Sequence, residues 1–171
     1  MPAKRYFSYR QIHRTVKHLA QSILDDDYDP DVIVAIGTGG FIPARILKTF
    51  IDRPILTVGI QLYDENNQPA ERPKKVQWID EVEKKLSGRK ILLVDEVDDT
   101  RTTLEYCLQE LLSHKTAETA VAVLHKKLKK KMGAIPGPVT RHFAGEELED
   151  VWIVYPWDAE DIDLHCELAE G

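Results

Sequence analysis

The sequence predicts an α/β fold: an open, mostly parallel twisted sheet flanked by helices. Short continuous apolar runs, typical of strands buried on both faces of a sheet, alternate with segments of helical periodicity. Two of these runs end in turns rich in glycine or in acidic residues, and ligands on such sheets bind at the carboxyl ends of the strands. A length of 171 residues suits a single domain with a sizeable core.

The predicted elements follow one another in the order that such a sheet requires. Ser8 and Gln11 fit a capping box, and the apolar residues after them recur at helical spacing until a turn at Asp29-Pro30. Strands are expected at residues 32–36, 55–60, 90–94, 119–124 and 151–155, and two further helices near residues 43–51 and 102–113. Residues 62–78 are polar, contain two prolines and lack an apolar period, so we expect a long loop there.

Composition argues against several classes of function. The net charge of −6 does not suit a domain that lies on a nucleic-acid backbone. No apolar run approaches the length that spans a bilayer, and the N-terminus leads into no signal-like stretch, so we expect a cytoplasmic protein without a membrane partner. Cys107 and Cys166 have no metal-site spacing and are expected to be free thiols.

Residues 91–103 carry the most chemistry, because acidic and hydroxyl side chains gather between an apolar strand and a helix start. These side chains are Asp95, Glu96, Asp98, Asp99, Thr100, Thr102 and Thr103. Paired carboxylates at a strand end can accept hydrogen bonds from sugar hydroxyls or hold magnesium. A threonine-rich helix start offers hydroxyls and backbone N–H groups to a phosphate. The alternative is an ordinary acidic N-cap region.

The segment resembles the motif of type I phosphoribosyltransferases that binds phosphoribosyl pyrophosphate (PRPP). The resemblance implies that Asp95 and Glu96 serve the ribose hydroxyls and a magnesium ion, with Asp98 and Asp99 also among the PRPP contacts. Asp99 would be the catalytic acid/base near the purine N7. The residues implied to wrap the 5-phosphate are Thr100, Arg101, Thr102 and Thr103.

Arg101 departs from the pattern of many family members, which have glycine there. The backbone must then manage without glycine's conformational freedom, while the added guanidinium could help to neutralise phosphate. A closely similar Asp-Glu-Val-Asp-Asp-Thr-Arg-Thr-Thr stretch belongs to the fungal hypoxanthine-guanine branch, so we interpret Arg101 as a subfamily trait.

A second segment, Gly37-Thr38-Gly39-Gly40, joins an apolar strand to a helix. Glycines let the backbone approach an anion closely, although a purely structural turn is about equally compatible with this pattern. The resemblance makes it the pyrophosphate loop, often with a strained or cis peptide, and Thr38 and Gly39 the expected contacts.

A third segment, Trp152-Ile153 followed by Pro156-Trp157-Asp158, resembles the hood of bacterial xanthine-guanine phosphoribosyltransferases. The resemblance implies that Trp152 stacks on the purine, that the Ile153 backbone reads its edge, and that Asp158 lies near the exocyclic edge or a metal-bound water. A core strand with aromatic packing is the alternative.

The base is indicated by a lysine. In 6-oxopurine enzymes of this family a lysine just past the strand that follows the PRPP motif donates to the purine O6. Lys126 matches that place, with Lys127 if the register shifts by one, and an ammonium cannot accept from an adenine amino group. Lys129, Lys130 and Lys131 are expected to face solvent.

Residues 62–78 stand where the family keeps a mobile loop that closes over PRPP, and Tyr63 is the implied lid contact. Closure would exclude water from the reacting centre.

The sequence thus predicts a single domain with a core at about residues 8–125 and a small hood over the base site, mainly from residues 126–171. The expected activity is magnesium-dependent transfer of the phosphoribosyl group of PRPP to hypoxanthine, guanine or xanthine, in a homodimer or higher homo-oligomer. Two alternatives stay open: a non-catalytic PRPP-sensing regulator of the same fold, and an enzyme for another base.

Overall fold

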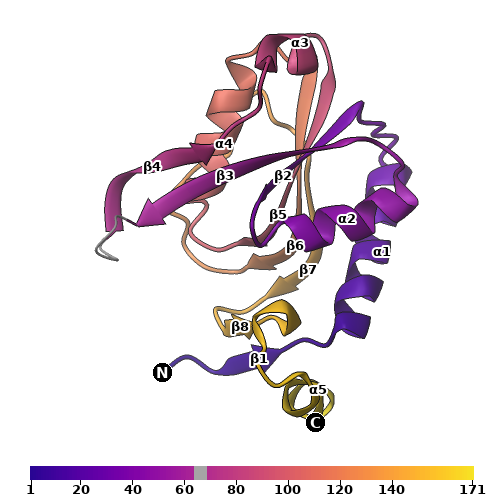
Figure 1. The fold of residues 1–171 in the computed structure, drawn as a ribbon, viewed down its shortest axis with the longest axis vertical. Helices are drawn as coiled ribbons and strands as arrows, with labels where there is room; N and C mark the ends of the chain where they lie inside the picture. Colours follow the sequence, from indigo (N-terminus) through magenta and orange to yellow (C-terminus); the bar gives the residue numbers. More distant parts are fainter. Residues whose placement is uncertain (64–68) are drawn as a thin grey trace.

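The main sheet has six strands in the order β4-β3-β2-β5-β6-β7, and all neighbours are parallel except β3 and β4 (Figure 1). The computed structural model describes the backbone of residues 1–63 and 69–171, and side chains outside residues 63–71. The strands of this sheet are β2 (Val32–Gly37), β3 (Ile55–Tyr63), β4 (Pro69–Gln77), β5 (Lys90–Asp98), β6 (Glu118–Lys127) and β7 (His142–Leu148). The predicted mostly parallel α/β fold is confirmed.

Helices cover both faces of this sheet because the central strands are apolar on both sides. Alternate residues of β2 enter opposite cores: Ile33 packs with the helices on one face and Val34 with those on the other. The first face carries α1 (Tyr9–Asp25) and α2 (Phe41–Phe50), and the second carries α3 (Val82–Leu86) and α4 (Thr102–Leu112). The two cores and the sheet between them give three layers.

The capping box predicted at the first helix is present. The Ser8 backbone N–H donates to Gln11 Oε1 at 2.7 Å, and the Gln11 backbone N–H donates to Ser8 Oγ at 3.3 Å. Within the described residues, the helices are all too short or too polar to cross a membrane.

A small second unit lies at one end of the main sheet (Figure 1). It consists of a two-stranded parallel sheet of β1 (Lys4–Tyr6) and β8 (Trp152–Val154), the 3-10 helix η1 (Pro156–Asp158) and α5 (Ile162–Glu170). The C-terminal segment is therefore divided, because β7 belongs to the main sheet while β8, η1 and α5 join the N-terminal strand.

The long loop predicted at residues 62–78 is wrong for most of its length. Pro69–Gln77 forms β4, which pairs with β3 in an antiparallel hairpin with irregular register. The segment has no apolar period because it is an edge strand, where proline can be accommodated without breaking an inner ladder. Residues 69–77 form a strand because their backbone hydrogen-bonds to β3, which their composition alone does not predict.

Candidate functional site

The glycine loop and the acidic turn lie side by side at the carboxyl ends of the two central strands of the main sheet. β2 and β5 are parallel neighbours, so the loop after Gly37 and the acidic end of β5 come out together. Two adjoining pockets, of about 390 and 250 Å3, share Leu62, Asp95, Glu96 and Thr103. The first is also lined by Gly37, Thr38 and Gly39, and the second by the turn from Asp99 to Thr102.

The glycine loop packs against the acidic pair so closely that two of its glycines have no room for a side chain. A Cβ on Gly39 would overlap the Glu96 carboxylate. A Cβ on Gly40 would lie 2.5 Å from the Ile36 carbonyl oxygen and 2.8 Å from that of Val94. The Gly37–Thr38 peptide bond is cis. The loop thus exposes backbone next to the two carboxylates.

Asp95 and Glu96 are adjacent in the chain, and their charges disfavour each other. Asp95 is buried and its Oδ1 accepts from the Glu96 backbone N–H at 2.8 Å. Burial, followed by the Glu96 carboxylate, raises the pKa of Asp95 well above its usual range. A cation or a set of hydroxyl donors would relieve this repulsion.

The carboxylates fit a magnesium ion that takes most of its ligands from elsewhere. No group of three or more His, Cys, Asp or Glu side chains placed to hold a metal occurs in the described part of the chain. Magnesium commonly uses one or two carboxylates and completes its shell with water and substrate phosphates. The pair Asp95 and Glu96 therefore suits an ion that arrives with a polyphosphate.

Asp98 and Arg101 form a buried ion pair inside the turn. The Asp98 side chain is fully buried, and both of its oxygens accept from Arg101, with Nη2 to Oδ2 at 2.7 Å. Arg101 has φ +71°, a left-handed conformation that favours glycine. The guanidinium is therefore directed at Asp98, and the phosphate contact of Arg101 stays a prediction.

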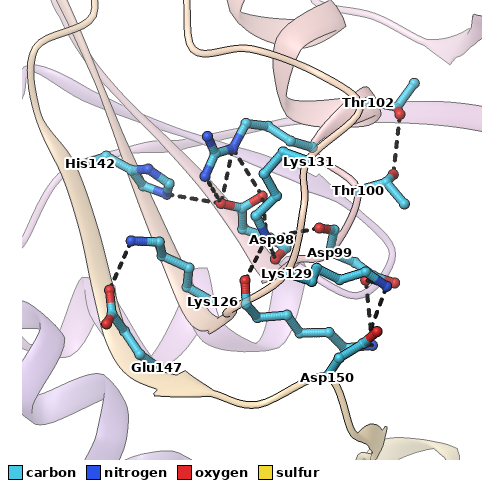
Figure 2. Close-up of polar contacts among 12 residues, drawn as sticks. Asp98, Asp99, Thr100, Thr102, Lys126, Lys129, Lys131, His142, Glu147 and Asp150 are labelled. Carbon is cyan, nitrogen blue, oxygen red and sulfur yellow. Dashed lines mark hydrogen bonds and ion pairs between the residues drawn. The ribbon is translucent and has the colours of Figure 1, made fainter. Parts of the chain in front are cut away.

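The turn from Thr100 to Thr103 places hydroxyl groups at the start of a helix. Thr100 Oγ1 and Thr102 Oγ1 lie 3.1 Å apart (Figure 2), and Thr102 opens α4 directly after Arg101. Unpaired N–H groups at a helix start favour an anion there. Thr103 lines both pockets, so the hydroxyls border the hollow that Asp95 and Glu96 occupy.

The Asp99 carboxylate faces Lys127, the last residue of β6, and Lys129 just after it. Its Oδ1 lies 3.1 Å from Lys129 Nζ and 3.5 Å from Lys127 Nζ, and Asp150 Oδ1 approaches the same two lysines. Asp99 Oδ1 is buried and makes no well-aligned hydrogen bond to any described residue. The Asp99 carboxylate can therefore accept a further hydrogen bond, and two lysine ammonium groups lie beside it.

Lys126 and Lys127 point to opposite sides because they are successive residues of β6. Lys126 Nζ donates to Glu147 Oε1 at 2.8 Å, away from Asp99 (Figure 2). The Lys127 side chain is 10% exposed and turns toward Asp99. The structure therefore places Lys127, the alternative of the sequence prediction, beside the predicted acid/base.

The predicted hood residues lie on the small unit. Trp152 is 59% exposed and lines a separate pocket of about 320 Å3 with Met1, Pro2 and Lys4. Ile153 is partly buried against the first core, and Asp158 is exposed at the end of η1. Tyr63 ends β3, and its side chain, with the predicted lid contact, lies outside the described residues.

Tyr155 connects the small unit to the site, and sequence reasoning missed it. Its hydroxyl donates to the Glu96 carbonyl oxygen at 3.3 Å and lies 2.8 Å from His125 Nδ1. Phe7, His125, Tyr155 and Trp157 form a column of aromatic rings with centroids 4.3 to 5.6 Å apart. The sequence predicts Tyr155 within an apolar strand, where a tyrosine is typical of core packing, whereas it follows β8 and only its contact with the Glu96 carbonyl identifies it.

His125 makes stability depend on pH. Burial, followed by the Arg5 charge, lowers its pKa from 6.5 to about 3. Between these values the unfolded chain takes up a proton that the folded protein refuses, so stability is complete above pH 6.5 and is lost as the pH falls. Between pH 7 and pH 5 we expect the free energy of unfolding to fall by about 2 kcal/mol because of His125, at 1.36 kcal/mol per pH unit.

Urea unfolding at pH 7 and 5 measures this loss. His125→Phe should shrink the difference between the two pH values, and His18→Gln, at an exposed site on α1, should leave it as in the wild type. An unchanged difference in His125→Phe would show that another group titrates.

Comparison with known proteins identifies the family. Residues 3–151 match the model of the phosphoribosyl transferase domain. The chain belongs to the phosphoribosyltransferase family. It is 40% identical to the hypoxanthine-guanine phosphoribosyltransferase of Schizosaccharomyces pombe, over 96% of this chain and 93% of that protein. It is 38% identical to xanthine phosphoribosyltransferase 1 of Saccharomyces cerevisiae, over 98% and 96%. These relatives place this phosphoribosyltransferase in the purine branch.

A solved structure extends the comparison. A hypothetical protein from Neisseria gonorrhoeae with bound ppGpp is 49% identical to this phosphoribosyltransferase. The two structures superpose with a TM-score of 0.93, over 99% of this chain and 97% of the other. The small unit is thus part of a fold that the two proteins share over nearly their full lengths.

Proposed function

We propose that this phosphoribosyltransferase transfers the 5-phosphoribosyl group of PRPP to hypoxanthine, guanine or xanthine, giving the nucleoside monophosphate and pyrophosphate. The observation that carries the proposal is the pair of adjoining pockets at the carboxyl ends of β2 and β5. They join a glycine loop, two carboxylates and a threonine turn in one hollow. Pyrophosphate, ribose and 5-phosphate are the three parts of PRPP, and they need these three kinds of surface.

In the proposed reaction, the purine N9 forms a bond to ribose C1 while the bond from C1 to pyrophosphate breaks. The pyrophosphate leaves with the bonding electrons along the backbone of residues 37–40. Asp95 and Glu96 hold the ribose hydroxyls, and the Asp99 carboxylate takes the proton that the purine loses at N7. Positioning and electrostatic stabilisation supply most of the rate in such a reaction.

Magnesium is the cofactor that this donor set suits. When bound with PRPP, the ion would neutralise charge on the departing pyrophosphate and lessen the repulsion between Asp95 and Glu96. Asp158, on the small unit, is proposed to lie near the exocyclic edge of the purine or near a water bound to the ion.

For the base, we propose Lys127 in place of Lys126. Lys127 is the more buried of the two and lies beside Asp99, so one purine could receive its O6 contact from Lys127 and its N7 contact from Asp99. The exposed indole of Trp152 provides a flat surface for stacking, with the Ile153 backbone beside it.

Substitution separates the two lysines. Lys127→Met should lower kcat/KM for hypoxanthine by about 10- to 100-fold, because a hydrogen bond to a charged group is worth about 1.5–3 kcal/mol. Lys126→Met, which loses only an exposed pair with Glu147, should stay within about 5-fold of the wild type. The reverse ranking would restore Lys126 as the purine contact.

A spectrophotometric assay tests the function. The protein is incubated with magnesium, PRPP and, in turn, hypoxanthine, guanine, xanthine and adenine, and nucleotide formation is followed by ultraviolet absorbance. We expect turnover with 6-oxopurines and little with adenine. Binding of PRPP without turnover of any base would instead support the PRPP-sensing regulator, and turnover of adenine alone would support the enzyme for another base.

A second proposed property is binding of ppGpp, because the Neisseria gonorrhoeae relative was solved with it. ppGpp is a guanosine with a diphosphate at each of its 5′ and 3′ positions, so it presents a purine, a ribose and phosphates to the same hollow. It should inhibit competitively with PRPP. Inhibition that persists at saturating PRPP would mean that ppGpp binds at another site.

We also propose a homodimer or higher homo-oligomer, which light scattering after size exclusion would measure.

A further inference from the structure

Lys131, in the segment after β6, holds three backbone carbonyls of the site together. Its Nζ donates to the carbonyl oxygens of Asp98, Asp99 and Lys127, at 2.8, 2.8 and 2.7 Å. Figure 2 shows the Lys131 side chain running to Asp98 and Asp99. The expectation that Lys131 faces solvent is wrong, since the side chain is 13% exposed.

These contacts use the ammonium group completely. An ammonium has three N–H donors and no acceptor, and each donor here has a carbonyl at short range. Asp98 Oδ1 also lies 3.6 Å from Nζ, although the Asp98 carboxylate is already paired with Arg101. Removing the ammonium would leave three backbone carbonyls short of a donor, which is costly, while Asp98 would keep its pair with Arg101.

The residues after Lys131 continue the same contact. The backbone N–H groups of Met132 and Gly133 both donate to the Thr100 carbonyl oxygen, at 3.0 and 3.1 Å. A Cβ on Gly133 would lie 2.5 Å from the Arg101 carbonyl oxygen, so the two segments touch without a side chain between them. Residues 131–133 therefore hold the carbonyls of three successive residues of the acidic turn, Asp98, Asp99 and Thr100.

The third carbonyl that Lys131 holds belongs to Lys127. One ammonium thus fixes the backbone of Asp99 relative to the backbone of Lys127. In the proposed function these two residues contact the same purine, from the end of β6 and from the turn after β5.

We propose that Lys131 is a positioning residue, which sets the Asp99 carboxylate and the Lys127 ammonium at the spacing of one purine base. The inference rests on the proposed function. Lys131 touches neither the base nor PRPP in this proposal and acts through Asp99 and Lys127.

The first test compares Lys131→Met with Lys130→Met. Both remove one lysine from the same run, but Lys130 is exposed and makes no hydrogen bond or ion pair with any residue that the structure describes. We expect kcat of Lys131→Met to fall by about 10- to 100-fold, since a misplacement near 1 Å can cost that much. Lys130→Met should match the wild type. Equal kcat in the two variants would overturn the inference.

A double-mutant cycle with Asp99→Asn separates positioning from general damage. If Lys131 acts through Asp99, Lys131→Met should reduce kcat far less in the Asp99→Asn background than in the wild type. The same fold-loss in both backgrounds would mean a merely structural role and overturn the proposal.

Lys131→Arg keeps the experiment decisive if Lys131→Met does not fold, as judged by circular dichroism. Lys131→Arg retains a cation, so its kcat should be higher than that of a folded variant with a neutral residue at position 131. The remaining loss of kcat should again be smaller in the Asp99→Asn background. An equal loss in both backgrounds would count against the proposal. A wild-type protein without turnover on any base would instead refute the proposed function itself, so the two failures are distinguishable.

Discussion

Asp99→Asn is expected to lower kcat by roughly 10²- to 10⁴-fold, the usual contribution of a general acid or base. The amide has the size of the carboxylate but cannot take the N7 proton or carry the charge that opposes it. The affinity for PRPP should change little, because the ribose and phosphate contacts are assigned to neighbouring residues. Steady-state kinetics for kcat and calorimetric titration with PRPP measure the two quantities.

Asp150→Asn is the matched control for that result. Asp150 Oδ1 approaches the same lysines as Asp99, Lys127 at 3.7 Å and Lys129 at 3.1 Å, and its side chain is similarly exposed, 53% against 42%, but no purine contact is assigned to it. Exposed ion pairs are worth about 0–1 kcal/mol, so kcat should fall by no more than about 5-fold. Comparable losses in both variants would mean that Asp99 serves only to neutralise the lysines, and wild-type kcat in Asp99→Asn would remove it from the mechanism.

Gly39→Ala is the second substitution with a large expected effect, and it should impair PRPP use without unfolding the protein. The added Cβ would overlap the Glu96 carboxylate, which can move because it is the end of a flexible side chain. Glu96 would then leave its place beside Asp95, and the alanine would narrow the hollow. We expect kcat/KM for PRPP to fall by about 100-fold, the scale associated with a misplacement near 1 Å.

Gly40→Ala provides the contrast. Its Cβ would meet the backbone carbonyls of Ile36 and Val94, which belong to the central strands and cannot turn away. The free energy of unfolding should drop by about 1–3 kcal/mol, as for other overpacked sites. Thermal unfolding together with PRPP kinetics distinguishes the two variants. A Gly39→Ala protein with wild-type kcat/KM would show that neither Gly39 nor the position of Glu96 matters for PRPP.

Arg101 illustrates why a motif alone does not give its side chains a role. The sequence marks the place as one where glycine is common, and the left-handed φ of +71° explains that preference. What the arginine does instead depends on Asp98, three residues earlier, which is buried and needs a cation. Burial is a property of the packed turn, and no local pattern reports it.

The lysine-rich run shows the same limit over a longer distance. Its composition suggests a solvated loop, yet Lys127 and Lys131 are largely buried and Lys129 pairs with Asp99. The basic run packs against the acidic turn, so its lysines face carboxylates. The two segments are about 30 residues apart in the chain, and the pairing of β5 with β6 brings them together. Their contacts therefore cannot be predicted from either segment alone.

The central sheet could be predicted from local sequence, because runs such as residues 32–36 and 91–94 are apolar on both faces and are buried only between two helical layers. The sequence also predicts that the glycine loop and the acidic turn carry the chemistry, since their residue types are costly in a core and useful around a phosphorylated sugar. Tertiary contacts were needed to show that Lys127 lies beside Asp99 and that Lys131 binds the backbone carbonyls of both residues. In a strand, a shift of one residue reverses the side on which a side chain lies, and that register is set by pairing between distant segments.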